Sequence, residues 1–102
     1  MNDKTREYMD KAAKIIETIP SVTKAVVVGP AVEKNFTFGD KIQLAVFTVP
    51  GDKYTKTFSD LNRALFDNDL TRIELYMTAD EDFYAAVYNL IDKGEIIYER
   101  QE

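Results

Sequence analysis

The chain has 102 residues, which fits one domain of ordinary size, and 45% of them are hydrophobic, enough for a packed core. Its formal net charge is −5, with lysines and arginines scattered among acids. This balance argues against a nonspecific nucleic-acid clamp and against an anionic membrane surface as partner. The absence of cysteine and histidine excludes disulfides, thiolate metal sites and a cysteine nucleophile, and it removes the commonest general base. A metal site would therefore need oxygen ligands, which suit Mg²⁺ or Ca²⁺.

The chain shows no targeting or membrane-spanning segment. Its N-terminal stretch is polar and charged, unlike a signal peptide, and no apolar run is long enough to cross a bilayer. We therefore expect a single cytoplasmic domain over residues 1–102.

The N-terminal half predicts a helix and two strands. In Asp3–Thr18, apolar residues recur at three- and four-residue steps, which is typical of an amphipathic helix, and Pro20 ends it. The valines of Val22–Val28 predict a strand buried on both faces. The next expected elements are a helical turn, a loop and a second strand: Ala31–Lys34, Asn35–Asp40 and Lys41–Val49.

The C-terminal half predicts two helices and two further strands. The helix Tyr54–Phe66 is expected first, then the strand Arg72–Met77 and the helix Glu81–Lys93. The side chains expected to face inward from the first of these helices are Phe58, Leu61, Leu65 and Phe66. Those expected from the second are Phe83, Val87, Leu90 and Ile91.

The ends of the last helix and the final strand complete the predicted order. A side-chain oxygen of Thr78 or Asp80 can cap the helix, and Gly94 can end it in the left-handed conformation. Charged flanks place the strand Glu95–Glu99 at a sheet edge. The order predicts an α+β (α/β layered) domain in which helices pack on a small mixed sheet.

The stretch Gly39–Phe47 (GDKIQLAVF) carries an unusual polar pair. Its apolar residues share one face by the two-residue period of a strand: Ile42, Leu44 and Val46. The other face begins with Lys41 and Gln43, although the strand is otherwise core material.

The layout around this strand resembles the minimal nucleotidyltransferase domain of the DNA polymerase beta superfamily. That family carries the signature G-S-x-x-x-G, five residues, then S-D-x-D-L. Laid on this chain without a gap, the first glycine falls on Gly29 and the leucine on Leu44, and the family's usual "LAV" continues. Downstream, Glu74 matches a third acidic residue, and Gly94 matches a glycine that ends the last helix. The resemblance implies a nucleotidyltransferase-like fold over nearly the whole chain.

The family's chemical residues are mostly replaced in this chain. The phosphate-holding serine falls on Pro30, which has neither an N–H nor a hydroxyl, and the second glycine falls on Lys34. The two metal-binding aspartates fall on Lys41 and Gln43, so that Glu74 alone keeps its carboxylate. Two carboxylates on one strand face form the metal clamp of this chemistry. We therefore expect no catalytic residue, no metal and no cofactor.

Several interpretations of these positions remain open. Lys41 can substitute for the lost metal and pair with Glu74 across neighbouring strands, or the face can simply line a shallow groove. The set Gly29, Pro30 and Lys34 is either a remnant phosphate loop or a plain turn at the end of a strand.

By the resemblance, we expect an inactive, antitoxin-like protein that binds a protein partner or itself. The family's antitoxin-like members occur beside small, all-helical HEPN-type partners. One alternative is a metal-dependent nucleotidyltransferase in which Asp40 and Glu74 hold Mg²⁺ and Lys41 contacts a nucleoside triphosphate. The other is a nucleotide-binding sensor in which Lys34 and Lys41 attract the phosphates.

Two aromatic pairs are candidate contact surfaces. Phe36 and Phe38 lie in the loop before the second strand, where they are either exposed or tucked under the sheet. Tyr84 and Tyr88 lie one helical turn apart, as a partner-facing stripe or as ordinary amphipathic packing.

Overall fold

The strands lie in one mixed sheet in the computed structural model, which describes residues 1–37, 39–51 and 53–100. The strands are β1 Val22–Val28, β2 Ile42–Thr48, β3 Ile73–Met77 and β4 Glu95–Glu99. Their order across the sheet is β3-β2-β1-β4. β1 runs antiparallel to β2 and β4, whereas β2 and β3 are parallel. The final strand lies at a sheet edge, as its charged flanks predict.

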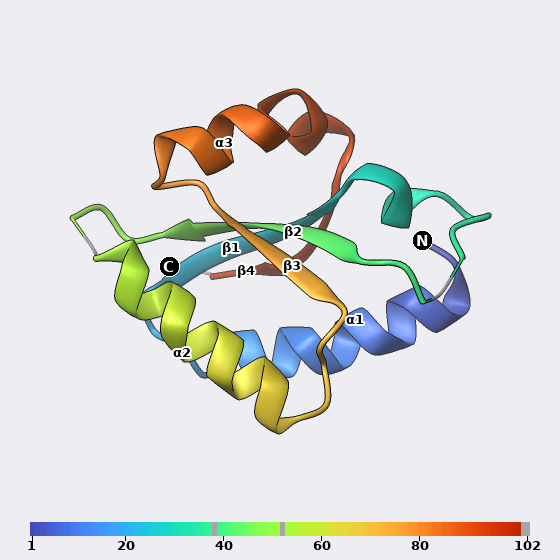
Figure 1. Ribbon diagram of the computed structural model, residues 1–102, viewed down its shortest axis with the longest axis horizontal. Coiled ribbons are helices and arrows are strands. Elements are labelled where there is room, and N and C mark those ends of the chain that lie inside the picture. The colour runs from blue at the N-terminus through green and yellow to red at the C-terminus, as the bar shows by residue number, and fades with distance from the viewer. Residues whose placement is uncertain (38, 52, 101–102) are drawn as a thin grey trace.

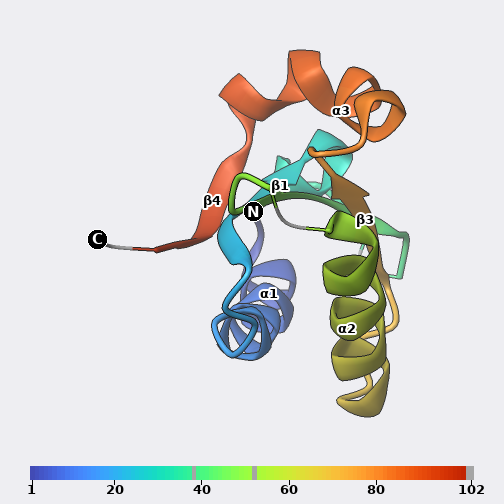
Figure 2. The same ribbon diagram turned by 90° about the vertical axis from the view of Figure 1, so that its left-hand side faces the viewer.

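Helices cover both faces of this sheet (Figure 1). α1 Asp3–Ile16 and α2 Tyr54–Asp67 lie on one face, and α3 Glu81–Val87 lies on the other, as the turned view in Figure 2 shows. Two 3₁₀ segments in the described chain are η1 Gly29–Val32 and η2 Tyr88–Lys93. The predicted α+β class, with helices on a small mixed sheet, is confirmed.

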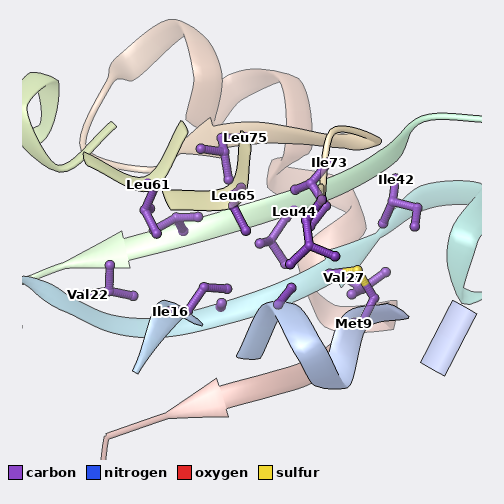
Figure 3. Close-up of a cluster of buried hydrophobic side chains, with 14 of the residues drawn as sticks. Met9, Ile16, Val22, Val27, Ile42, Leu44, Leu61, Leu65, Ile73 and Leu75 are labelled. Carbon is purple, nitrogen blue, oxygen red and sulfur yellow. The ribbon is translucent and has the colours of Figure 1, made fainter. Parts of the chain in front are cut away.

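The larger core lies between the sheet and the helices α1 and α2 (Figure 3). Met9 of α1 and Leu61 of α2 are fully buried there with Leu44 of β2. A smaller cluster lies under α3 and consists of Val26, Val28, Ala45 and Val87. The valine run of β1 is therefore buried on both faces, as predicted.

The predicted helix Glu81–Lys93 is divided, and its end differs from the expectation. α3 ends at Val87, and the chain continues as η2. Gly94 has a φ of −78°, so it is extended and not left-handed. A glycine is required there for space, because an added Cβ would lie 2.5 Å from Val26 Cγ1 and 2.7 Å from the Val27 carbonyl oxygen.

Two predictions about aromatic side chains have different outcomes. Phe66 is 70% exposed, so its expected inward position is wrong. It follows the buried Leu65, and successive helical residues point about 100° apart. Phe36 packs against the larger core, which confirms the tucked interpretation for that residue. Phe38 lies outside the described residues.

None of the helices in the described ranges combines the length and apolar character needed to cross a membrane.

Candidate functional site

The sheet face beneath α3 carries the positions that the sequence singles out. Side chains alternate between the two faces along a strand. The residues on this face are Gln43, Ala45 and Phe47 of β2, Lys24, Val26 and Val28 of β1, and Glu74 and Tyr76 of β3. Val87 of α3 packs over the middle of the face. A polar group around Gln43 lies at one end, and a group around Phe47 lies at the other.

Gln43 faces Glu74 in the register of the two parallel strands. Its amide Nε2 donates to the Tyr76 hydroxyl at 3.4 Å, and that hydroxyl donates to the Glu74 carboxylate. The hydrogen bond to Glu74, with some desolvation, raises the pKa of the Tyr76 hydroxyl above its ordinary 10.0. The single carboxylate at this position is therefore already engaged by a neighbouring side chain.

Lys41 does not pair with Glu74. It lies immediately before β2, is exposed, and its Nζ donates to the Thr71 carbonyl oxygen at 3.2 Å. Of the two interpretations of this strand face, the ion pair between Lys41 and Glu74 is therefore wrong. The pair does not form because each group has another partner. The Lys41 ammonium donates to the Thr71 backbone carbonyl before β3, and the Glu74 carboxylate accepts from the Tyr76 hydroxyl of the same strand.

Position 29 favours glycine for two reasons, its backbone conformation and the closeness of a neighbouring side chain. It has a φ of +74°, and an added Cβ would lie 2.4 Å from the Gln43 Oε1 atom. Pro30 follows it in η1, which begins two residues earlier than expected. A hollow of about 210 Å³ beside this turn is lined by Gly29, Pro30, Val32, Glu33, Leu90 and Lys93. Lys34 is exposed and does not line that hollow.

The donor set around Gln43 fits a divalent cation poorly. It offers one carboxylate that is already hydrogen-bonded and one neutral amide, whereas Mg²⁺ is held by carboxylates and phosphate oxygens. Asp40 is exposed at the approach to β2. Across residues 1–37, 39–51 and 53–100, no three acidic side chains are grouped as a metal site would require.

A second feature, at the other end of the same face, is not among the sequence predictions. Lys24 pairs in register with both Phe47 and Glu99, so the three side chains form one row across the sheet. The Lys24 Nζ lies 5.6 Å from the centroid of the Phe47 ring and 3.9 Å from the Glu99 carboxylate. The two-residue period of the strand places Phe47 on this face, but its contact with Lys24 follows only from the strand register.

Two hollows adjoin at this row. One, of about 370 Å³, is lined by Lys24, Phe47, Tyr84, Tyr88, Asn89, Ile91 and Asp92. The other, of about 430 Å³, is lined by Thr23, Lys24, Phe47, Glu99 and Arg100. Tyr84 and Tyr88 are 37% and 59% exposed, and their rings meet edge to face with centroids 5.4 Å apart. The pair therefore forms an exposed stripe on the outer side of α3 and η2, which agrees with both interpretations of the pair.

Comparison with known proteins does not assign the chain to a family. No protein-family model matches it, and a search of curated proteins finds no match.

Proposed function

We propose that the chain is a nucleotidyltransferase-like domain without catalytic activity that acts by binding a protein partner or a second copy of itself. The observation that carries this proposal is the facing pair Gln43 and Glu74 on adjacent parallel strands. The resemblance puts metal-holding carboxylates at these two positions. Here an amide replaces one of them, and the Tyr76 hydroxyl occupies the other.

The chemistry of nucleotidyl transfer explains why these changes remove activity. The reaction depends on divalent metals that bridge the phosphates and activate the attacking hydroxyl. One carboxylate without a second on the same strand face cannot hold such an ion against water. By the resemblance, Lys41 also replaces the first metal-holding aspartate with a side chain that cannot bind a cation.

A labelling assay tests the loss of catalysis. The full chain is incubated with each labelled nucleoside triphosphate and Mg²⁺ or Mn²⁺, alone and with a co-expressed partner. We expect no labelled protein or nucleic acid. A labelled product that disappears in the Glu74→Ala variant would instead establish the alternative, a metal-dependent nucleotidyltransferase with an atypical site.

Association is tested separately. Light scattering reports whether the chain forms a dimer, and co-purification reports whether a neighbouring reading frame supplies a partner, with a small all-helical HEPN-type protein as the first candidate. A stable complex of either kind supports the proposal, and a monomer that binds nothing encoded beside it counts against it. A cytoplasmic location accompanies this proposal and is checked by cell fractionation.

A further inference from the structure

The two adjoining hollows at the Phe47 end of the sheet form one surface, which we name the α3–β4 groove. It consists of the residues that line the hollows of about 370 and 430 Å³, and Lys24 and Phe47 belong to both. The groove runs from the exposed side of α3 and η2, across β2 and β1, to the end of β4. Lys24 and Phe47 belong to the sheet face under α3, and Figure 2 shows that α1 and α2 cover the other face.

Three aromatic side chains lie in the groove. Phe47 is half-buried on its floor, and Tyr84 and Tyr88 stand exposed along one side. Rigid aromatic rings that are already held in place contribute much of the binding energy of protein interfaces, because little conformational entropy is lost when they are covered. The edge-to-face contact of the two tyrosines favours this arrangement of their rings in the unbound chain.

The groove lining carries two cations and two acids, and the charge among them that lacks a partner in the described chain is acidic, which favours a positively charged occupant. Its cations are already engaged, since Lys24 contacts Glu99 and the Arg100 guanidinium donates to the Pro20 carbonyl oxygen. The Asp92 carboxylate in the groove is exposed and has no hydrogen-bond or ion-pair partner among the described residues. Glu81 stands one helical turn before Tyr84 and adds a second exposed acid on that side of α3.

The same charges disfavour a second copy of this chain in the groove. Each copy has a formal net charge of −5, so two copies repel one another as they approach. A partner with a basic surface is attracted instead, and complementary charge raises both its encounter rate and its selectivity.

We propose that the α3–β4 groove binds a cationic amphipathic segment of a partner protein. Apolar side chains of that segment cover Phe47, Tyr84 and Tyr88, and its lysines or arginines face Asp92 and Glu81. This inference rests on the proposed partner-binding function and names the chemistry of the partner.

Designed peptides test the groove on the full chain. The first probe is a helical peptide of about 18 residues, long enough to fold in part, with a stripe of leucines flanked by arginines. The second probe replaces every arginine by glutamate. Binding is followed by backbone amide shifts in NMR spectra of the labelled protein. We expect the arginine peptide to shift amides of β1, α3, η2 and β4, and the glutamate peptide to leave them unchanged.

Matched variants separate the groove from other apolar surface. Tyr88→Ala is expected to weaken binding of the arginine peptide about tenfold, as truncation of a central aromatic contact does. Phe66→Ala removes a similarly exposed ring from α2 on the opposite face and is expected to leave affinity unchanged. Asp92→Lys is expected to weaken binding, whereas Asp10→Lys on α1 makes the same charge change away from the groove and has little effect.

Several outcomes would overturn the inference. These are equal binding of both peptides, amide shifts confined to another face, equal effects of Tyr88→Ala and Phe66→Ala, or groove shifts that appear with rising protein concentration and no peptide. None of these outcomes bears on catalysis. A labelled product in the nucleotide assay would instead overturn the proposed function, so the two failures are distinguishable.

Discussion

Gly29 meets two separate demands on its sequence position, one from its backbone conformation and one from a neighbouring side chain. Its φ of +74° lies in the left-handed region, and an added Cβ would meet the Gln43 Oε1 atom at 2.4 Å. Gly51 has a similar φ of +82° but nothing within 4 Å of its added Cβ. A substitution at Gly51 therefore introduces backbone strain alone, whereas one at Gly29 introduces backbone strain and a steric clash.

We expect Gly51→Ala to cost about 1–2 kcal/mol of unfolding free energy through backbone strain alone. Gly29→Ala is expected to cost more, because Gln43 must also move. Urea denaturation of the two variants gives both values. Adding Gln43→Ala to Gly29→Ala should recover the excess, and equal losses at the two glycines would show that Gln43 imposes no constraint.

The strand position of Glu74 could be predicted, but the hydrogen-bond partners of Lys41 and Glu74 could not. The resemblance implies that Glu74 lies on a strand next to β2, and the register places it there. The sequence does not predict the partners of the two charges. A lysine side chain is long and flexible, so its hydrogen bond depends on which acceptor the loops bring near, here the Thr71 carbonyl. Such choices arise from tertiary contacts that a strand pattern does not contain.

Strand and helix positions were more predictable than helix ends. β1 has the predicted bounds because the valine run lies between two breaking segments, and β2 and β3 fall within one residue of expectation at each end. The last helix differs because Val87 must pack on β1 and β2 while the chain returns to β4. The tighter η2 segment makes that return, and local propensity gives no sign of it.

A hydrogen bond between two elements makes stability depend on pH. The Tyr54 hydroxyl at the start of α2 donates to Asp80 Oδ2 at 2.6 Å, and Asp80 Oδ1 caps α3 through the Asp82 and Phe83 amides. These bonds, the one from Tyr54 foremost, hold the pKa of Asp80 below its ordinary 3.8. A lowered folded-state pKa gives stability that is present above the unfolded value and is lost as the pH falls through the folded one.

Tyr54→Phe is therefore expected to lower the melting temperature by a few degrees at neutral pH. The difference from the unsubstituted chain should shrink as the pH falls below about 4, because Asp80 then becomes protonated in both proteins. Thermal melts across that range measure it. Tyr8→Phe, which removes the hydroxyl that accepts from the Arg72 amide, is the matched control. A Tyr54 difference that stays constant with pH would assign the effect to packing instead.

Across the whole molecule, the two ends of the sheet face under α3 differ in their side chains. α3 divides it into the polar group around Gln43 and the aromatic α3–β4 groove around Phe47. At one end hydrogen bonds join Gln43, Tyr76 and Glu74, and the other end is an open surface with acidic neighbours.

If the scaffold still has the shape of a metal site, replacing two side chains should restore binding of the ion. Lys41→Asp with Gln43→Asp adds two carboxylates beside Glu74 on one face. Without metal, their mutual repulsion is expected to lower the melting temperature. Millimolar Mg²⁺ should then raise it again, because an ion that binds only the folded state stabilises it. The unsubstituted chain should show no such response.

The control for this experiment is Lys41→Asn with Gln43→Asn, which removes the ammonium and shortens the amide but adds no carboxylate. Its melting temperature is expected to be the same with and without Mg²⁺. If the aspartate variant also fails to respond, the backbone positions of residues 41 and 43 are not those of a metal clamp. The resemblance on which the proposed function rests would then lose its geometric support, while the α3–β4 groove, which depends on neither position, would remain to be judged by its own peptide experiment.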